Sequence, residues 1–322
     1  MIRRMIMARK FTQPAESRTS LDEAFEEFME ERQAANLSKD TLRNYQKSYD
    51  LFYNYHNLNS TSLLEQIDMS MFYKWINHMK QNEIRPQSIN HYLRDLRSFF
   101  NWCNRNKDTD IHIREIEAQE DLPKMYSDDD IQTLLVKPRP GDSYTQWRDW
   151  ICINIAYATG LRASTLCALR LEDINFERGE LAIQKQKNKK AGFLPITPAL
   201  ATALKEYLRK WFKEADADEL LLQTITGNPL NPNALNHSLD KYCKARGVEP
   251  KGIHAIRHNF SRDMILNGGG EYRLQKYLQH SSIQMSQHYV KLFAADLKKD
   301  AAEFSPLDNM KKKNSRTSKF KK

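Results

Sequence analysis

The feature that most constrains the fold of this chain is a break in the spacing of its apolar residues. From residue 19 to about residue 105, apolar side chains recur every three or four positions, as on the buried face of amphipathic helices. Residues 107–125 lose this period, mix both signs of charge and end in Leu122-Pro123-Lys124, a composition typical of a linker. The break predicts one domain over residues 19–106 and a second over residues 126–305.

The first domain is expected to be a bundle of four helices. Ser20 followed by Glu23 has the spacing of a capping box and marks the start of the first helix. The second helix follows Ser38, the third is predicted over residues 69–79, and the fourth begins after Pro86. Four short helices with one apolar face each can close around a single core.

The second domain is expected to be mixed α+β, so the whole chain is predicted to be mainly α with a small β-hairpin or sheet. Ser127 is the expected cap of its first helix. Two strands are predicted over residues 180–184 and 193–196, on either side of a Lys-rich run over 185–190. Apolar spacing predicts further helices over residues 146–159, 163–170, 198–214, 231–246, 254–267, 271–279 and 282–303.

The formal net charge of +9 is concentrated at the two ends of the 322-residue chain. Residues 1–18 and the tail over 306–322 are rich in Lys and Arg and are expected to be flexible. Basic ends attract polyanions, but they are also common solubilising segments. Net charge alone therefore does not identify a nucleic-acid partner.

Two classes of protein are disfavoured by composition. No apolar run reaches the about 18 to 20 residues that a membrane span needs, which predicts a cytoplasmic protein without a membrane partner. Cys103, Cys152, Cys167 and Cys243 form no Cys-x-x-Cys pair. We expect four reduced, buried thiols rather than disulfides or a zinc site.

Two motifs carry groups suited to phosphate chemistry. In Thr159-Gly160-Leu161-Arg162, the glycine can end one helix and place the guanidinium of Arg162 at the start of the next, where a phosphate is readily held. His254 and Arg257 are three positions apart and therefore share one face of a helix.

Further along the chain, His280 is followed by Tyr289. Guanidinium groups can clamp the oxygens of a phosphodiester, imidazoles can move protons, and a phenol can attack phosphorus. A phenol is a poor nucleophile at its ordinary pKa near 10, so it needs cationic neighbours. Taken singly, each of these residues would more often be structural, and the Lys-rich run would usually be a solvated turn.

These motifs, in this order, resemble the tyrosine recombinases, the phage-integrase type of site-specific recombinase. The family pattern is Thr-Gly-x-Arg, a Lys in a β-hairpin, His-x-x-Arg, Gly-His, and a Tyr nine residues after that His. The match runs from about Tyr126 to Phe293, and the preceding bundle resembles the family's core-binding domain, so most of the chain is covered.

The resemblance implies a role for each of the six matching residues. Tyr289 would attack phosphorus to give a 3′-phosphotyrosyl link and a free 5′-hydroxyl. Arg162 and Arg257 would neutralise charge on the phosphate. His254 would act as the general base for the phenol. His280 would donate a hydrogen bond to the phosphorane, and Lys187 would protonate the leaving 5′-oxygen. No cofactor and no metal are implied.

Several positions depart from the family pattern or leave it open. Lys185 is the alternative to Lys187 if the hairpin register slips. Thr165 stands where the family usually has an acidic residue, and Gln279 where it often has Gly. His258 is expected to have a structural role within its helix.

The resemblance also implies partners. Two domains would clamp double-stranded DNA like a C, four copies would assemble on two DNA sites, and accessory DNA-binding factors could take part. A protein of bacterial, archaeal, phage or mobile-element origin, associated with the nucleoid, is implied. The residues expected to contact DNA phosphates, on the second and fourth helices, are Lys39, Arg43, Lys47, Arg94 and Arg97. The amides of Gln87, Asn90 and Asn101 are candidates for base reading.

Three other functions use similar groups. A type IB topoisomerase shares the tyrosine chemistry, but the spacing of the His and Tyr motifs and the small helical bundle favour a recombinase. A catalytically silent DNA-binding relative would fit the replacements at Thr165 and Gln279. An enzyme acting on a phosphate outside nucleic acid would leave the basic faces of the bundle unexplained.

Overall fold

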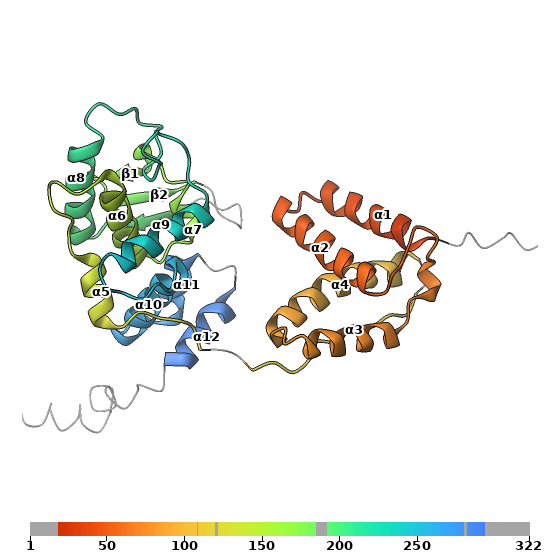
Figure 1. Ribbon diagram of the computed structural model, residues 1–322. Helices are drawn as coiled ribbons and strands as arrows, with labels where there is room; N and C mark the ends of the chain where they lie inside the picture. Colours follow the sequence, from red (N-terminus) through yellow and green to blue (C-terminus); the bar gives the residue numbers. More distant parts are fainter. Residues whose placement is uncertain (1–18, 108, 120–121, 185–191, 280–281, 294–322) are drawn as a thin grey trace, which may run out of the picture. The chain divides into compact units, whose positions relative to one another are not determined.

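The computed structural model describes residues 19–107, 109–119, 122–184, 192–279 and 282–293. The chain divides into two compact units, residues 1–121 and residues 122–322. Each unit has its own hydrophobic core. The fold is mainly α-helical with a small sheet, as the sequence predicts (Figure 1).

The described part of the first unit contains four α-helices and a short 3-10 helix: α1 (Leu21–Ala34), α2 (Lys39–Tyr55), η1 (Leu64–Gln66), α3 (Met69–Gln81) and α4 (Pro86–Asn106). Ser20 and Glu23 form the predicted capping box at the start of α1, with hydrogen bonds of 3.0 and 3.1 Å. Aromatic rings fill the core, because the α-helices each turn one apolar face inward. Phe25 stacks on Tyr49 with ring centroids 3.8 Å apart, and Phe52 stacks on Phe72 at 4.7 Å.

The segment after α4 has no helix or strand among its described residues 109–119, but it packs on the first unit. Ile111 and Ile113 are buried in the core of the bundle. Asn90 of α4 donates to the carbonyl oxygen of Ile116 and accepts from its backbone N–H, both at 2.9 Å. Gln87 donates to the carbonyl oxygen of Gln119 at 2.6 Å. The amides considered above for base reading at these two positions therefore bind the chain's own backbone in this structure.

The second unit surrounds a central helix with other helices and places a small sheet at one side (Figure 1). Its helices are α5 (Asp128–Leu135), α6 (Tyr144–Thr159), α7 (Ala163–Leu166), η2 (Leu171–Asp173), α8 (Pro198–Trp211), α9 (Pro232–Lys244), α10 (Ile253–Leu266), α11 (Glu271–Leu278) and α12 (Ile283–Phe293). The helix predicted over residues 163–170 is shorter, because the chain turns after Leu166 and re-forms only one 3-10 turn at η2.

The sheet has three antiparallel strands in the order β1 (Ile174–Asn175), β2 (Glu180–Ile183) and β3 (Gly192–Pro195). Leu181 pairs with Leu194, and both side chains face the core. Sequence analysis predicts β2 and β3 but not β1, whose two residues are too few to show an alternating pattern.

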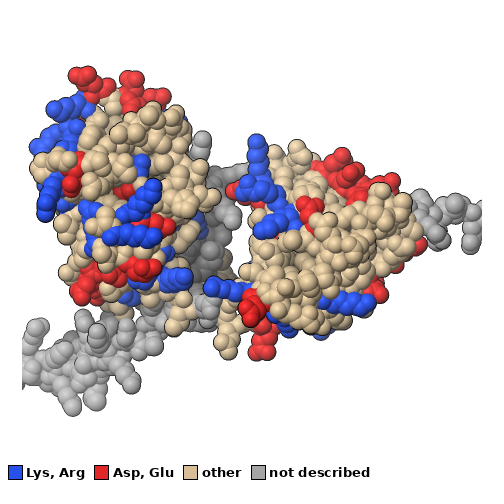
Figure 2. Space-filling model, viewed as in Figure 1, with Lys and Arg blue, Asp and Glu red and all other residues tan. Residues whose placement is uncertain are grey.

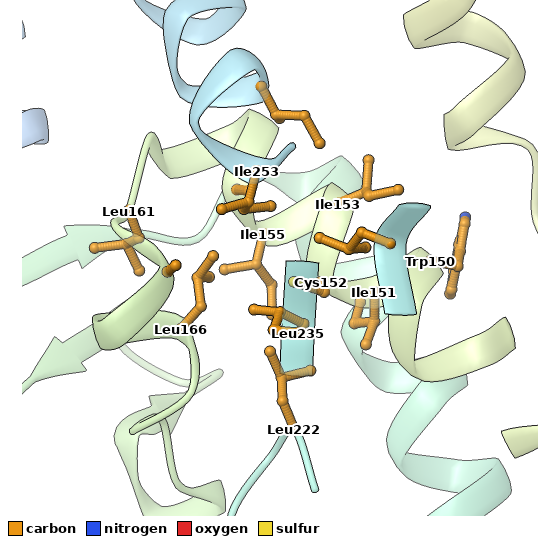
Figure 3. Close-up of a cluster of buried hydrophobic side chains, with 14 of the residues drawn as sticks. Trp150, Ile151, Cys152, Ile153, Ile155, Leu161, Leu166, Leu222, Leu235 and Ile253 are labelled. Carbon is orange, nitrogen blue, oxygen red and sulfur yellow. The ribbon is translucent and has the colours of Figure 1, made fainter. Parts of the chain in front are cut away.

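Helix α6 is the core of the second unit. It packs against α5, α8, α9 and α10, so most of its sides are covered and its sequence has little amphipathic character. Figure 3 shows Ile151, Cys152 and Ile155 of α6 surrounded by apolar side chains from other parts of the unit, among them Leu235 of α9 and Ile253 of α10. The four cysteines are all buried and free, as predicted.

No helix among the described residues is both long and apolar enough to span a membrane.

Gly160 connects this core to the predicted phosphate-binding motif. It ends α6 in the left-handed conformation, with φ of 66°. A Cβ atom at this position would lie 2.5 Å from Phe260 and 2.6 Å from Leu278. Only glycine allows both the turn and the close approach of α10 and α11 to the start of α7.

Replacing Gly160 with Ala should therefore destabilise the protein by about 2 to 4 kcal/mol, from the left-handed backbone and the overlap with Phe260 and Leu278. Urea unfolding of the full chain measures the change. Gly141→Ala is the control, because nothing lies within 4 Å of a Cβ there. Equal unfolding midpoints for the two variants would contradict the packing argument.

Candidate active site

The structure brings four of the six predicted site residues together in the second unit. Arg162 is the N-cap of α7, His254 and Arg257 lie one turn apart on α10, and Tyr289 lies on α12. The helices α10, α11 and α12 pack against one another. Three segments far apart in the sequence thus supply one cluster of two guanidinium groups, an imidazole and a phenol.

Arg257 is the most buried member of this cluster, with 5% of its surface exposed. Its guanidinium donates to the carbonyl oxygen of Gly160 and, at 3.1 Å, to that of Leu278. Burial and the nearby charge of Arg162 lower the pKa of Arg257 to about 10, while interactions with Tyr289 oppose that shift. Two fixed carbonyl groups therefore hold a positive charge that water solvates poorly, which makes it an effective partner for an anion.

Arg162 and His254 complete the cluster around Arg257. Desolvation lowers the pKa of Arg162, and proximity to Tyr289 opposes the shift. The side chain of His254 is partly open to solvent. Its loss of hydration lowers the pKa of His254, and the charges of Arg257 and Arg162 lower that pKa further. The imidazole of His254 is therefore held in its neutral form, which is the form able to accept a proton.

The Tyr289 hydroxyl is the fourth polar group of this cluster. Burial raises the pKa of Tyr289, whereas Arg257, a hydrogen bond with Ser261 and Arg162 lower it. The hydroxyl is 2.8 Å from Nδ1 of His258. Its ring packs on the apolar cluster of Phe260, Leu274 and Leu278. The phenol is thus held by α10 and α11 of its own chain, beside both guanidinium groups.

His258 and Ser261 are the residues that sequence analysis misses. His258 is expected above to have only a structural role, but its ring contacts the hydroxyl of the predicted nucleophile. The signal is the spacing on α10: positions 254, 257, 258 and 261 follow the i, i+3, i+4, i+7 pattern and share one helix face.

The other two predicted residues, Lys187 and His280, lie outside the described residues, as does the alternative Lys185. The strands that flank this Lys-rich run are described. Gln184, directly after β2, donates to the buried carboxylate of Asp173 at 2.6 Å.

The two departures from the family pattern have different surroundings. Gln279 adopts the left-handed backbone with φ of 53°, a conformation that suits Gly and that costs other residues about 1 kcal/mol. Thr165 is buried and lines a cavity of about 170 Å³ that Asp173 and Gln184 also line. A carboxylate is therefore present in this region although position 165 does not provide it.

The predicted phosphate-contacting residues of the first unit lie on α2 and α4. Lys39, Arg43 and Lys47 are exposed, and Lys47 lies over the ring of Tyr92 on α4 at 5.8 Å, so the two helices share this side of the bundle. Figure 2 shows Lys and Arg side chains gathered at one end of the bundle and Asp and Glu side chains over α1.

The arginines of this surface have acidic partners. Arg94 and Arg97 both bind Glu115, at 3.2 and 2.5 Å, and Arg43 binds Asp40 at 2.6 Å. Any anion that bound these arginines would compete with a carboxylate of the same chain.

Among the described residues, no three His, Cys, Asp or Glu side chains are grouped to hold a metal ion.

Comparison with known proteins identifies relatives of both units. Residues 124–295 match the phage integrase family, and residues 23–107 match the N-terminal SAM-like domain of phage integrases. The chain is 30% identical to tyrosine recombinase XerA of Pyrococcus furiosus, over 70% of this chain and 76% of the relative. It is 27% identical to tyrosine recombinase XerC of Thermodesulfovibrio yellowstonii, over 78% of this chain and 85% of that relative.

Solved structures share the fold. A lambda integrase tetramer bound to a Holliday junction superposes with a TM-score of 0.66 at 16% identity, covering 85% of this chain and 78% of the other. The Tn1549 transposon integrase in complex with a circular intermediate DNA gives a TM-score of 0.68 at 17% identity, covering 87% of this chain and 99% of the other.

The lowered pKa of His254 has a consequence for stability. An unfolded chain protonates this imidazole near its ordinary pKa of 6.5, whereas the folded chain resists protonation. The unfolded state therefore binds more protons as pH falls through 6.5, and the free energy of unfolding decreases. In His254→Gln, the decrease between about pH 7.5 and about pH 5.5 should be smaller than in the unchanged protein.

Urea unfolding at the two pH values measures this difference. His237→Gln, at an exposed position on α9, is the control and should keep the full decrease. A His254→Gln variant with the full decrease would show that His254 is not held neutral.

Proposed function

Because the chain belongs to the phage integrase family and is a site-specific DNA recombinase, we propose that it cuts and rejoins duplex DNA with Tyr289 as its nucleophile. The observation that carries this assignment is the position of the Tyr289 hydroxyl beside the guanidinium groups of Arg162 and Arg257. A phosphodiester bound at this cluster would meet two cations and an attacking oxygen together.

Each described residue has a defined part in the proposed reaction. Arg162 and Arg257 bind the non-bridging oxygens and stabilise the charge that grows on them, which is typically worth about 3 kcal/mol for one well-placed donor. Neutral His254 accepts the phenol proton as Tyr289 attacks phosphorus. The Tyr289 oxygen then forms a bond to phosphorus, and the bond to the 5′-oxygen breaks.

The roles of Lys187 and His280 in the proposed mechanism are assigned from their positions in the sequence motifs. Lys187 protonates the departing 5′-oxygen, so that a free 5′-hydroxyl is released, and His280 donates a hydrogen bond to the phosphorane. The 3′-phosphotyrosyl link conserves the energy of the broken phosphodiester. A 5′-hydroxyl from another duplex can therefore reverse the attack without ATP.

The proposed assembly is a homo-tetramer on two duplex DNA sites. The DNA would be that of a bacterium, an archaeon or a mobile element. Accessory DNA-binding factors would take part where the reaction has a set direction. Its support is the fold shared with a lambda integrase tetramer bound to a Holliday junction. Lys39, Arg43, Lys47, Arg94 and Arg97 are proposed to contact the phosphates of each site.

The nucleophile is tested by trapping it on DNA. The chain is incubated with fragmented genomic DNA of its source, covalent complexes are isolated under denaturing conditions, and the recovered sites are sequenced. A nicked duplex of a recovered site should then trap the unchanged protein on a 3′-phosphate, leaving a 5′-hydroxyl that a kinase can label. Tyr289→Phe should trap none, while Tyr272→Phe, at an exposed position on α11, should trap normally.

Other results would assign the chain differently. Noncovalent binding without any adduct would indicate a silent DNA-binding relative. Relaxation of supercoiled plasmid that lacks a recovered site would indicate a topoisomerase, an alternative that the matched relatives do not support.

The ion pairs of Glu115 predict a measurable competition with DNA. Replacing Glu115 with Gln frees Arg94 and Arg97, so the dissociation constant for a mixed-sequence duplex should fall about two- to fivefold, the value of an exposed ion pair. Glu117→Gln makes the same change of charge at an exposed position two residues away and should have less effect. The gain in DNA affinity should disappear when Arg94→Ala and Arg97→Ala are combined with Glu115→Gln. Equal effects of Glu115→Gln and Glu117→Gln on the dissociation constant would refute the competition.

A further inference from the structure

The nucleophile is contacted by a residue that the six-residue reaction scheme leaves without a task. His258 lies on α10 directly after Arg257, and its Nδ1 is 2.8 Å from the Tyr289 hydroxyl. The two rings are 5.6 Å apart, centroid to centroid, and inclined by 38°. The rings are tilted and not stacked face to face, and the close contact is the one between the polar atoms.

The direction of the hydrogen bond depends on which ring nitrogen of His258 carries the proton. In a neutral imidazole, one ring nitrogen accepts while the other carries the proton. With the proton on Nε2, Nδ1 of His258 accepts the hydrogen bond that the Tyr289 O–H donates. A phenol held in this way has its oxygen placed on α10 with its lone pairs free of that contact, and the O–H turns from Nδ1 of His258 toward His254 when the proton is transferred.

The surroundings make this contact specific. Tyr289 of α12 contacts both His258 of α10 and the apolar cluster of Phe260, Leu274 and Leu278. Arg257 is fixed by the carbonyl oxygens of Gly160 and Leu278. His258 lies next to Arg257 on α10. The contact between Tyr289 and His258 therefore also sets the distance between the Tyr289 hydroxyl and the Arg257 guanidinium.

We propose that His258 is a positioning residue for the nucleophile, which docks the Tyr289 hydroxyl on α10 and thereby sets its distance from the phosphate held by Arg162 and Arg257. This inference rests on the proposed function of Tyr289 but concerns a residue outside that catalytic set. Displacing a reacting atom by about 1 Å can cost on the order of a hundredfold in rate. The contact should therefore affect the rate of covalent attack more than the binding of DNA.

Substitutions at position 258 separate hydrogen bonding from shape. His258→Phe keeps a flat ring but removes the acceptor. His258→Asn is smaller but can place its Oδ1 close to the position of Nδ1, so it restores the acceptor. His237→Phe, at the exposed position on α9, is the control for loss of an imidazole. Thermal unfolding of each variant shows which ones are folded.

The measurement is the single-turnover rate of covalent adduct formation on a nicked site at saturating DNA. His258→Phe should lower this rate about tenfold or more, with the DNA dissociation constant changed less than about twofold, and His258→Asn should return it to within about threefold of the unchanged protein. Equal rates in His258→Phe and the unchanged protein, or equal losses in the Phe and Asn variants, would overturn the proposal.

A second measurement does not depend on activity. A 3-fluorotyrosine placed at position 289 reports the environment of the phenol by ¹⁹F NMR in the free protein. The signal should shift in His258→Phe, return toward its original position in His258→Asn and stay unchanged in His237→Phe. An unshifted signal in His258→Phe would overturn the docking contact. If the unchanged protein forms no adduct, the proposed function fails, and this NMR comparison still decides the role of His258.

Discussion

The burial of Arg257 is the constraint on which the rest of the active site depends. A guanidinium loses much of its hydration when it is 95% buried, so it must be held by acceptors that cannot move away. The acceptors here are the carbonyl oxygens of Gly160, where α6 ends, and Leu278, at the end of α11. The same charge therefore joins α10 to the turn that carries Arg162, and the two guanidinium groups keep a fixed relation to each other.

Helix α10 then acts as the reference for every other group in the site. One of its faces carries His254, Arg257, His258 and Ser261, and α12 presents Tyr289 to that face. Its opposite side packs on α6, the most buried helix of the unit. A rigid helix with one face in the core and one face in the site is well suited to hold reacting groups to a fraction of an ångström.

Much of this arrangement can be predicted from the sequence, because it follows local rules. Caps at Ser20, Ser38 and Ser127, the glycine turn at Gly160 and the apolar spacing are all readable, and the structure confirms the helices that they predict. The role of His258 is not readable, because it depends on where α12 docks. The amide of Asn90 and the carboxylate of Glu115 also find partners far along the chain, which no local pattern reveals. Tertiary contacts between distant segments decide these positions.

Two asparagines use the same device at either end of the connection between the units. Asn90 binds the backbone N–H and carbonyl oxygen of Ile116, and the buried Asn259 binds those of Tyr126, at 2.9 and 2.8 Å. Each pair of hydrogen bonds satisfies the backbone N–H and carbonyl oxygen of one residue, which is therefore fastened to its own unit. The two ends of the connection are thus anchored independently, each by an amide side chain of the unit on which it packs.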